Sequence, residues 1–178
     1  MRKLRTIEME RLSVDEFKSA DKLPLIVVLD DVRSLYNVGS VFRTGDAFRI
    51  AAVYLCGITA TPPNAEIHKT ALGGEDSVEW RYFATADEAV KALHDDGIFV
   101  YAVEQAEGST MLQDLRLPQS KGYAVIFGNE VKGIHQEVVD LCDGCIEIPQ
   151  YGTKHSMNVS VTAGIVMWEI LKRTKCYR

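Results

Sequence analysis

The chain reads Ile148-Pro149-Gln150-Tyr151-Gly152 and, two residues later, His155-Ser156-Met157-Asn158-Val159-Ser160-Val161-Thr162-Ala163-Gly164. A polar loop passes here directly into an apolar pattern with helical spacing, and Ser156, Asn158 and Ser160 crowd the junction. A helix start leaves backbone N–H groups unpaired, and a single Ser or Asn is enough to cap it. Three such residues exceed that need, so the junction is predicted to bind a polar ligand.

Around this junction, the chain alternates apolar runs with amphipathic patterns. Short runs rich in Val, Ile and Tyr predict buried strands at residues 25–29, 52–56, 98–103, 123–127 and 145–148. Helices are predicted at residues 35–48, 86–95, 131–142 and 157–173, with a short one at 66–73. The expected fold class is therefore α/β, a mainly parallel sheet flanked by helices. Residues 1–178 are expected to form a single domain, with a helix at about residues 5–20 lying on its outside.

The composition is that of an ordinary globular protein, with 178 residues, 47% hydrophobic and 25% charged. No apolar run approaches membrane-spanning length and the start lacks the apolar core of a signal peptide, so a cytoplasmic protein is expected. The cysteines Cys56, Cys142, Cys145 and Cys176 are too scattered for a disulfide framework. Cys142 and Cys145 form a CxxC without a second ligand pair, which favours structural thiols, and no metal site is expected.

Positive charge gathers at the two ends of the chain, although the net charge is −5. Residues 1–11 hold four Lys or Arg against two Glu, and residues 171–178 hold four Lys or Arg and no acid. A nucleic acid, if one binds, would be expected at these ends. Solvated ends explain the pattern equally well. The polar patch at His68, Lys69 and Thr70 carries the same two interpretations.

A second junction of polar and apolar residues lies at residues 29–44. On a helix that advances about 100° per residue, Asn37, Ser40, Arg43 and Thr44 fall within an arc of about 120°. The opposite arc is apolar, so one face would pack while the other presents an amide, two hydroxyls and a guanidinium. A capped amphipathic helix with a solvated polar face is the simpler interpretation, and it stays open.

A third segment, Phe127-Gly128-Asn129-Glu130, ends a predicted strand just before a predicted helix. Gly128 would permit a tight turn and the close approach of a ligand, and Glu130 would favour the dipole of the helix that it begins. The segment is neither a P-loop nor a dinucleotide fingerprint, and turn chemistry alone could explain it.

Parallel sheets bind ligands beyond the carboxyl ends of their strands, which here points to the loops after Leu29, Val103, Phe127 and Ile148. Three of these four loops begin or lie beside the polar segments described above. The segments are therefore expected to meet at one edge of the sheet.

Together the segments resemble the three signature motifs of the SpoU/TrmH family, S-adenosylmethionine-dependent RNA 2′-O-ribose methyltransferases of the SPOUT class. Asn-x-Gly-x-x-x-Arg-Thr is met at Asn37, Gly39, Arg43 and Thr44, and Gly-Asn-Glu-x-x-Gly at residues 128–133. Ile-Pro…Ser-x-Asn-Val-Ser is met at residues 148–160, with Met157 where the family often has Leu. The resemblance implies the family's fold, in which the C-terminal segment threads through a loop to form a deep trefoil knot.

The resemblance further implies methyl transfer from S-adenosylmethionine to a ribose 2′-hydroxyl, without a metal. The candidate catalytic residues are Arg43, Asn37, Glu130, Ser156 and Asn158. The candidate cofactor-binding residues are Val103, Glu104, Gly128, Asn129, Ile148, Ser156 and Met157. The family's proposal for Arg43 is deprotonation of the hydroxyl. Because a guanidinium is a poor base at neutral pH, a bidentate clamp on the RNA phosphate is the physically cheaper role.

The expected partners are a tRNA or rRNA substrate and a second copy of the chain, joined partly through residues 157–173, with no membrane. The length of the chain suggests the family's compact form, closer to tRNA-modifying members. Two alternatives stay open: a SPOUT-type base methyltransferase, and a non-catalytic RNA-binding dimer. The Asn-x-Gly-x-x-x-Arg motif argues against the base methyltransferase, and retention of Arg43, Asn158 and Glu130 argues against the non-catalytic dimer.

Overall fold

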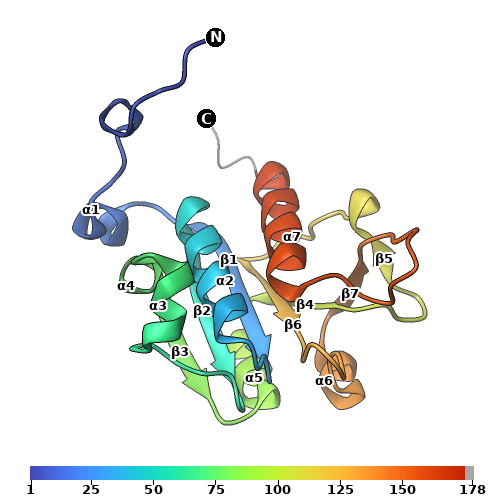
Figure 1. The fold of residues 1–178 in the computed structure, drawn as a ribbon. Coiled ribbons are helices and arrows are strands. Elements are labelled where there is room, and N and C mark those ends of the chain that lie inside the picture. The colour runs from blue at the N-terminus through green and yellow to red at the C-terminus, as the bar shows by residue number, and fades with distance from the viewer. Residues whose placement is uncertain (175–178) are drawn as a thin grey trace.

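The computed structural model describes residues 1–174, so Cys176 and the basic residues Lys175 and Arg178 lie outside the described part of the chain. Within that part, seven strands form one sheet in the order β3-β2-β1-β6-β4-β7-β5. Every neighbouring pair of strands is parallel. Helices cover both faces of the sheet (Figure 1). The predicted α/β class with a mainly parallel sheet is confirmed.

The described strands are β1 Leu23–Asp30, β2 Ile50–Cys56, β3 Glu79–Phe83, β4 Phe99–Val103, β5 Thr110–Met111, β6 Tyr123–Phe127 and β7 Gly144–Glu147. The α-helices are α1 Val14–Ser19, α2 Leu35–Ala47, α3 Ala65–Ala71, α4 Gly74–Ser77, α5 Ala86–Asp95, α6 Gln136–Leu141 and α7 Val159–Arg173. Short 3₁₀ helices occupy Thr6–Met9 and Leu112–Asp114. All five predicted strands are present, and no end is shifted by more than two residues.

Four details of the predicted secondary structure are wrong. The edge strands β3 and β5 were not predicted, because β3 is largely exposed and β5 has two residues. The helix predicted at 131–142 begins only at Gln136, and the last helix begins at Val159 rather than Met157. Residues 5–20 form two short helical turns rather than one helix.

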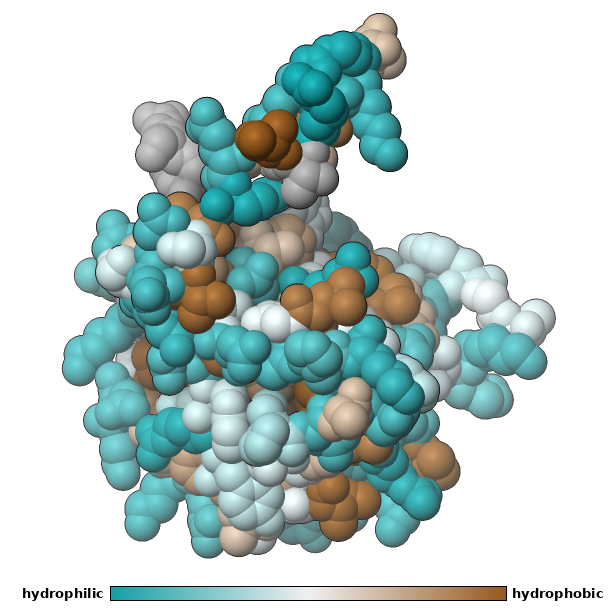
Figure 2. All heavy atoms as spheres, turned by 60° about the vertical axis from the view of Figure 1, so that its left-hand side comes forward, coloured by the Kyte–Doolittle hydropathy of each residue, from teal (hydrophilic) through white to brown (hydrophobic). Residues whose placement is uncertain are grey.

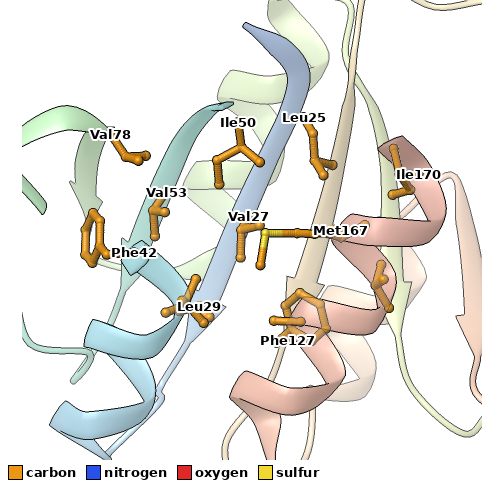
Figure 3. Close-up of a cluster of buried hydrophobic side chains, with 14 of the residues drawn as sticks. Leu25, Val27, Leu29, Phe42, Ile50, Val53, Val78, Phe127, Met167 and Ile170 are labelled. Atoms are coloured by element: carbon orange, nitrogen blue, oxygen red, sulfur yellow. The ribbon is translucent and has the colours of Figure 1, made fainter. Parts of the chain in front are cut away.

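The sheet divides the buried side chains into two cores. Alternate residues of β1 point to opposite faces, as the period of two of a strand requires. Leu25, Val27 and Leu29 face α2 and α7, where they lie near Met167 (Figure 3). Val28, on the opposite face, belongs to a second core formed with α5 and α6. Burial on both faces explains why the central strands read as continuous apolar runs.

The N-terminal residues project from the body of the molecule as an arm (Figures 1 and 2). At its base α1 contacts α4, and Phe17 is the buried side chain of that helix. Ser13 caps α1 through the backbone N–H of Glu16, whose carboxylate accepts a hydrogen bond from the Ser13 N–H in return. Across residues 1–174, no helix combines the length and apolarity needed to cross a membrane.

The described cysteines behave as structural thiols. Cys56 is buried and Cys142 and Cys145 are half-buried, all three without a disulfide. Burial raises the pKa of the Cys56 and Cys142 thiols to about 12 and also raises the pKa of Cys145. Thiols with such pKa values stay protonated and unreactive at neutral pH.

The C-terminal segment meets the segment that follows β4 at two points. The Gln105 side-chain amide donates to the backbone oxygen of His155 at 2.6 Å. Further along α7, the Arg173 guanidinium donates to the backbone oxygen of Gln113 at 2.9 Å. These contacts fit a C-terminal segment passing close to the loop after β4, while the trefoil knot itself stays a prediction.

Candidate active site

A cavity of about 360 Å³ opens beyond the carboxyl ends of β4, β6 and β7, and the residues before α7 form its remaining wall. Its lining includes every residue that the sequence predicted for the cofactor: Val103, Glu104, Gly128, Asn129, Ile148, Ser156 and Met157. The strand order explains this convergence, because β4 lies between β6 and β7. Gln105, Lys132, Gln150 and His155 also line the cavity. The sequence marked them only by their position beside the motifs.

Gly128 lets the backbone of its own loop come close to itself. Asn129 and Gly133 exchange two backbone hydrogen bonds, at 3.1 and 2.9 Å, so the segment folds back on itself as a tight hairpin. A Cβ on Gly128 would lie 2.2 Å from the Gly133 carbonyl carbon and 2.4 Å from the Ile134 nitrogen. The glycine is therefore required by the hairpin, whatever ligand also approaches it. The same hairpin delays the start of α6 until Gln136.

Glu104 joins the loop after β4 to this hairpin. Its carboxylate accepts hydrogen bonds from the Ile134 N–H at 3.2 Å and from the Gln105 N–H at 2.8 Å. Gly133, at φ 69°, lets the backbone turn beside the same carboxylate. Two walls of the cavity are thus held together by one side chain.

The sequence suggested that Glu130 stabilises the start of the helix that follows it, but the structure gives this side chain other partners. Its carboxylate instead accepts from the backbone N–H groups of Arg33 and Ser34, both at 3.0 Å, and from the Asn37 amide at 3.2 Å. These donors surround the start of α2, whose dipole favours a negative charge there. Burial acts to raise the pKa of Glu130, but the N–H donors outweigh it and the pKa lies below its ordinary value.

A chain of amide hydrogen bonds extends this contact to the third motif. The Asn158 side-chain N–H donates to the Asn37 side-chain oxygen at 3.1 Å, and Asn37 is 8% exposed. The Asn129 side chain donates to the backbone oxygen of Asp31 at 2.8 Å. All three polar segments predicted from the sequence therefore meet at one junction. Asn37 contacts both Glu130 and Asn158 there.

Some of the polar residues at the junction before α7 serve to cap that helix. The Asn158 side-chain oxygen accepts from the N–H groups of Ser160 and Val161 and from the Ser160 hydroxyl at 2.7 Å, which caps α7. Ser156 takes no part in the cap: its side chain is exposed and lines the cavity. It therefore stays available to a ligand in the cavity.

Arg43 is not brought to the cavity of its own chain. It is exposed on α2 and lines a separate hollow with Ser13 and Phe17 of the N-terminal region and with Gly73. Six residues separate it from Asn37, a rise of about 9 Å along a helix. The polar arc predicted on α2 is thus divided between a buried site residue and an exposed arginine.

Gly39 lets the backbone of a neighbouring helix come close to α2. A Cβ at this position would lie 2.1 Å from the Thr70 hydroxyl and 2.3 Å from the backbone oxygen of Ile67. The glycine therefore allows α3 to pack closely on α2.

The charged ends of the chain are partly neutralised. Arg2 and Arg5 pair with Glu8, and Lys172 and Arg173 pair with Glu169. In the patch at α3, Lys69 pairs with Glu66 and His68 with Glu75. Within residues 1–174, Lys132 and Lys154 take part in no such pair, and both are exposed near the cavity. No group of His, Cys, Asp and Glu suited to a metal ion occurs in the described part of the chain.

Residues 24–168 match the model of the SpoU rRNA Methylase family. The chain belongs to this family. The match includes all three motifs predicted from the sequence, and it spans β1 to most of α7.

Curated SpoU-family relatives include rRNA and tRNA enzymes. The 23S rRNA (guanosine-2′-O-)-methyltransferase of Neisseria meningitidis is 30% identical over 87% of the chain and 61% of that protein. The tRNA (guanosine(18)-2′-O)-methyltransferase of Thermus thermophilus is 30% identical over 91% of the chain and 81% of that protein. The chain thus spans about three fifths of the rRNA relative and four fifths of the tRNA relative.

Solved structures agree with the fold. The AdoMet-bound rRNA methyltransferase of Sinorhizobium meliloti is 25% identical, with a TM-score of 0.79 over 85% of the chain and 57% of that structure. The TrmH/SpoU tRNA-modifying enzyme of A. aeolicus has a TM-score of 0.77 over 89% of the chain and 79% of that structure, at 24% identity. The sheet and helices that surround the cavity of this chain therefore belong to a fold shared with these enzymes.

Proposed function

We propose that the protein is an S-adenosylmethionine-dependent methyltransferase that modifies a ribose 2′-hydroxyl of tRNA or rRNA. The observation that carries the proposal is the cavity beyond β4, β6 and β7, which meets the junction of Asn37, Glu130 and Asn158. Membership of the SpoU family supports it. So does the S. meliloti relative, whose structure holds AdoMet.

The cavity suits this cofactor in size and charge. Its volume of about 360 Å³ lies within the usual range for small-molecule sites. The carboxylates of Glu104, Glu130 and Glu147 line it, and negative charge favours a ligand that carries a sulfonium and an ammonium. Backbone groups near Gly128, Ile148 and Met157 would hold the adenine and the methionine portion. The bound cofactor supplies an electrophilic methyl carbon.

The chain's own residues would position the acceptor. Ser156 and Asn158 would orient the ribose or the cofactor, because both lie where α7 begins beside the cavity. Asn37 and Glu130 would keep the first and second motifs in a fixed relation through their hydrogen bond. Orientation of this kind lowers a barrier because it removes the entropy cost of aligning two reactants.

RNA would approach across the mouth of the cavity. Lys132, Lys154 and His155 are exposed on the two loops that border it, and Tyr151 is 95% exposed. Cations and an exposed aromatic ring are the groups that bind phosphates and stack on unpaired bases. This local cluster would provide a binding surface for RNA on a chain whose net charge is −5. We therefore propose a cytoplasmic location, where such substrates are found.

We also propose that the protein acts as a homodimer. Val161, Ile165 and Trp168 are 52%, 38% and 48% exposed and follow one another along one face of α7. Helix α2 packs beside α7, where the Phe48 and Trp168 rings lie 5.9 Å apart. A two-fold contact through this face would bring Arg43 of the partner subunit towards RNA bound at the cavity, where it would clamp a phosphate.

Two measurements test the function. Calorimetry on chelator-treated protein should detect S-adenosylmethionine binding, since no metal is required. Labelled methyl transfer to RNA from a strain lacking the enzyme should give nucleosides methylated on the ribose after complete digestion. Methylation on the base would identify a base methyltransferase instead, and binding of RNA without any transfer would identify a non-catalytic RNA-binding dimer.

A further inference from the structure

Methylation of a hydroxyl group releases a proton, which the site must accept. A ribose 2′-hydroxyl is a weak acid, so a positioned base accelerates its attack on an electrophile. Arg43 is poorly suited to that role, because a guanidinium is a poor base at neutral pH and because Arg43 lies outside the cavity of its own chain. Another group near the cavity must therefore be sought.

The carboxylates that line the cavity are already occupied. Glu130 accepts from the Arg33 and Ser34 N–H groups and from Asn37. Glu104 accepts from two backbone N–H groups, and Glu147 accepts from a serine hydroxyl at 2.7 Å. Hydrogen bonds of this kind favour the charged form and weaken a carboxylate as a base.

His155 is the histidine that lines the cavity. It lies on the loop between β7 and α7, directly before Ser156, and its side chain is exposed at the cavity mouth. The Gln105 amide holds its backbone oxygen at 2.6 Å, which fixes this part of the loop beside the end of β4. Within residues 1–174, its ring forms no ion pair, whereas the rings of His68 and His94 each contact a carboxylate.

We infer that the His155 imidazole is the base that accepts the proton of the ribose 2′-hydroxyl, an assignment that rests on the proposed function. In this step the O–H bond breaks and its proton forms an N–H bond with the ring, while the oxygen forms a bond to the methyl carbon. The S–CH₃ bond breaks, and its electron pair stays on sulfur, giving a neutral thioether. Imidazole is suited to this role because it changes protonation state near neutral pH.

Charge in the cavity supports this direction of proton transfer. The sulfonium loses its positive charge as the imidazolium gains one, so the cavity carries the same net charge before and after the step. Glu104, Glu130 and Glu147 line the same cavity and would stabilise the imidazolium. Lys132, which also lines it, and Lys154, the preceding residue, oppose that charge from the exposed side.

The test is the pH dependence of methyl transfer by the full-length protein with RNA from a strain lacking the enzyme. The variants are His155→Gln, which cannot accept a proton at neutral pH, and His155→Ala, which leaves space for added imidazole. His135→Gln is the matched control, because it removes an exposed histidine that does not line the cavity. Affinities for S-adenosylmethionine and RNA are measured for each variant.

His155→Gln should lower kcat by about 10²- to 10³-fold at neutral pH, with affinities within a few-fold of the wild type. The fall in wild-type activity at acid pH should be absent from the variant, so the difference in kcat between the two proteins should narrow as pH falls and the imidazole becomes protonated. Added imidazole should restore activity to His155→Ala in proportion to its unprotonated fraction. His135→Gln should behave as the wild type.

The inference is overturned if the wild type transfers methyl groups to ribose and His155→Gln keeps its rate and its acid limb. It is also overturned if His155→Gln loses affinity for either ligand in place of kcat, since His155 would then be a binding residue. A wild-type protein that methylates no RNA ribose contradicts the proposed function itself, which distinguishes the two failures.

Discussion

Two glycines within helices of similar character should respond in opposite directions to the same substitution. Gly39 lies in α2 and Gly164 in α7. A Cβ on Gly39 would meet the Thr70 hydroxyl at 2.1 Å and the Ile67 backbone oxygen at 2.3 Å, whereas a Cβ on Gly164 finds its nearest neighbour, the Thr44 methyl, at 3.8 Å. The first two distances are severe overlaps, and the last is an ordinary contact.

The magnitudes follow from these distances. The Thr70 hydroxyl could rotate away, but the Ile67 oxygen belongs to the backbone of α3, so relief requires that helix to shift. Overpacking costs about 3 kcal/mol when backbone must move, and the helix propensity of Ala returns about 1 kcal/mol. Gly39→Ala should therefore lose about 2 kcal/mol of unfolding free energy. Gly164→Ala should gain about 0.5–1 kcal/mol.

Thermal unfolding followed by circular dichroism checks both values. For a domain of this size, Gly39→Ala should melt about 4–8 °C below the wild type and Gly164→Ala about 1–4 °C above it. Because Gly164 lies on the helix proposed to dimerise, all three proteins are compared at one protein concentration. A Gly39→Ala protein that melts at or above the wild type would refute the close α2–α3 contact as the reason for the glycine.

Three further outcomes are expected. Arg43→Ala should lose about a thousandfold or more in the rate of methyl transfer, while its melting temperature and cofactor affinity stay near those of the wild type. Arg43→Lys should restore little of that rate, because an ammonium cannot form a bidentate clamp. Wild-type turnover in Arg43→Ala would contradict this expectation. Glu130→Gln should destabilise the protein at pH 7 by about 1–2 kcal/mol, a value reduced for the solvent exposure of the side chain. The pKa of Glu130 is lowered on folding, so its contribution to the free energy of unfolding is present above the ordinary pKa of about 4.3 and is lost as pH falls through the folded value. Urea unfolding near pH 3.5 should therefore show a smaller difference in stability between the wild type and Glu130→Gln than at pH 7. Trp168→Arg should shift the sedimentation of the protein towards a monomer, whereas Ile58→Arg, which changes an exposed apolar residue outside α7, should not.

The strands could be predicted because their neighbours in the sheet bury them on both faces. Residues of β6 are all buried, so Tyr123–Phe127 reads as an unbroken apolar run with the bounds that the structure shows. Strand β3 escaped prediction for the opposite reason: it lies at the sheet edge, and its exposed Glu79 and Arg81 interrupt the apolar signal. A pattern based on burial identifies central strands and misses edge strands.

The residues that line the candidate cavity could be predicted, but the hydrogen-bond partners and packing roles of the motif residues could not. Resemblance to a family gave the cofactor set, all of which lines one cavity. The local sequence assigned Glu130 to the helix next to it, whereas its partners lie 93 to 97 residues away on α2 and the loop before it. Arg43, on the polar arc of α2, likewise lies outside the cavity of its own chain. Contacts across such separations depend on topology, which short sequence patterns do not encode.

The hydrogen bonds among Glu130, Asn37 and Asn158 also set an order in time. Asp30 ends β1, and Asn158 follows it by 128 residues (158 − 30). At about 5–20 residues per second, a ribosome needs roughly 6–26 s to add that stretch. A nascent chain can pair β1 with β2 long before then, yet the last wall of the cavity does not exist until Asn158 has been made. Occupancy of the cavity by a small ligand would thus report that synthesis has passed this point.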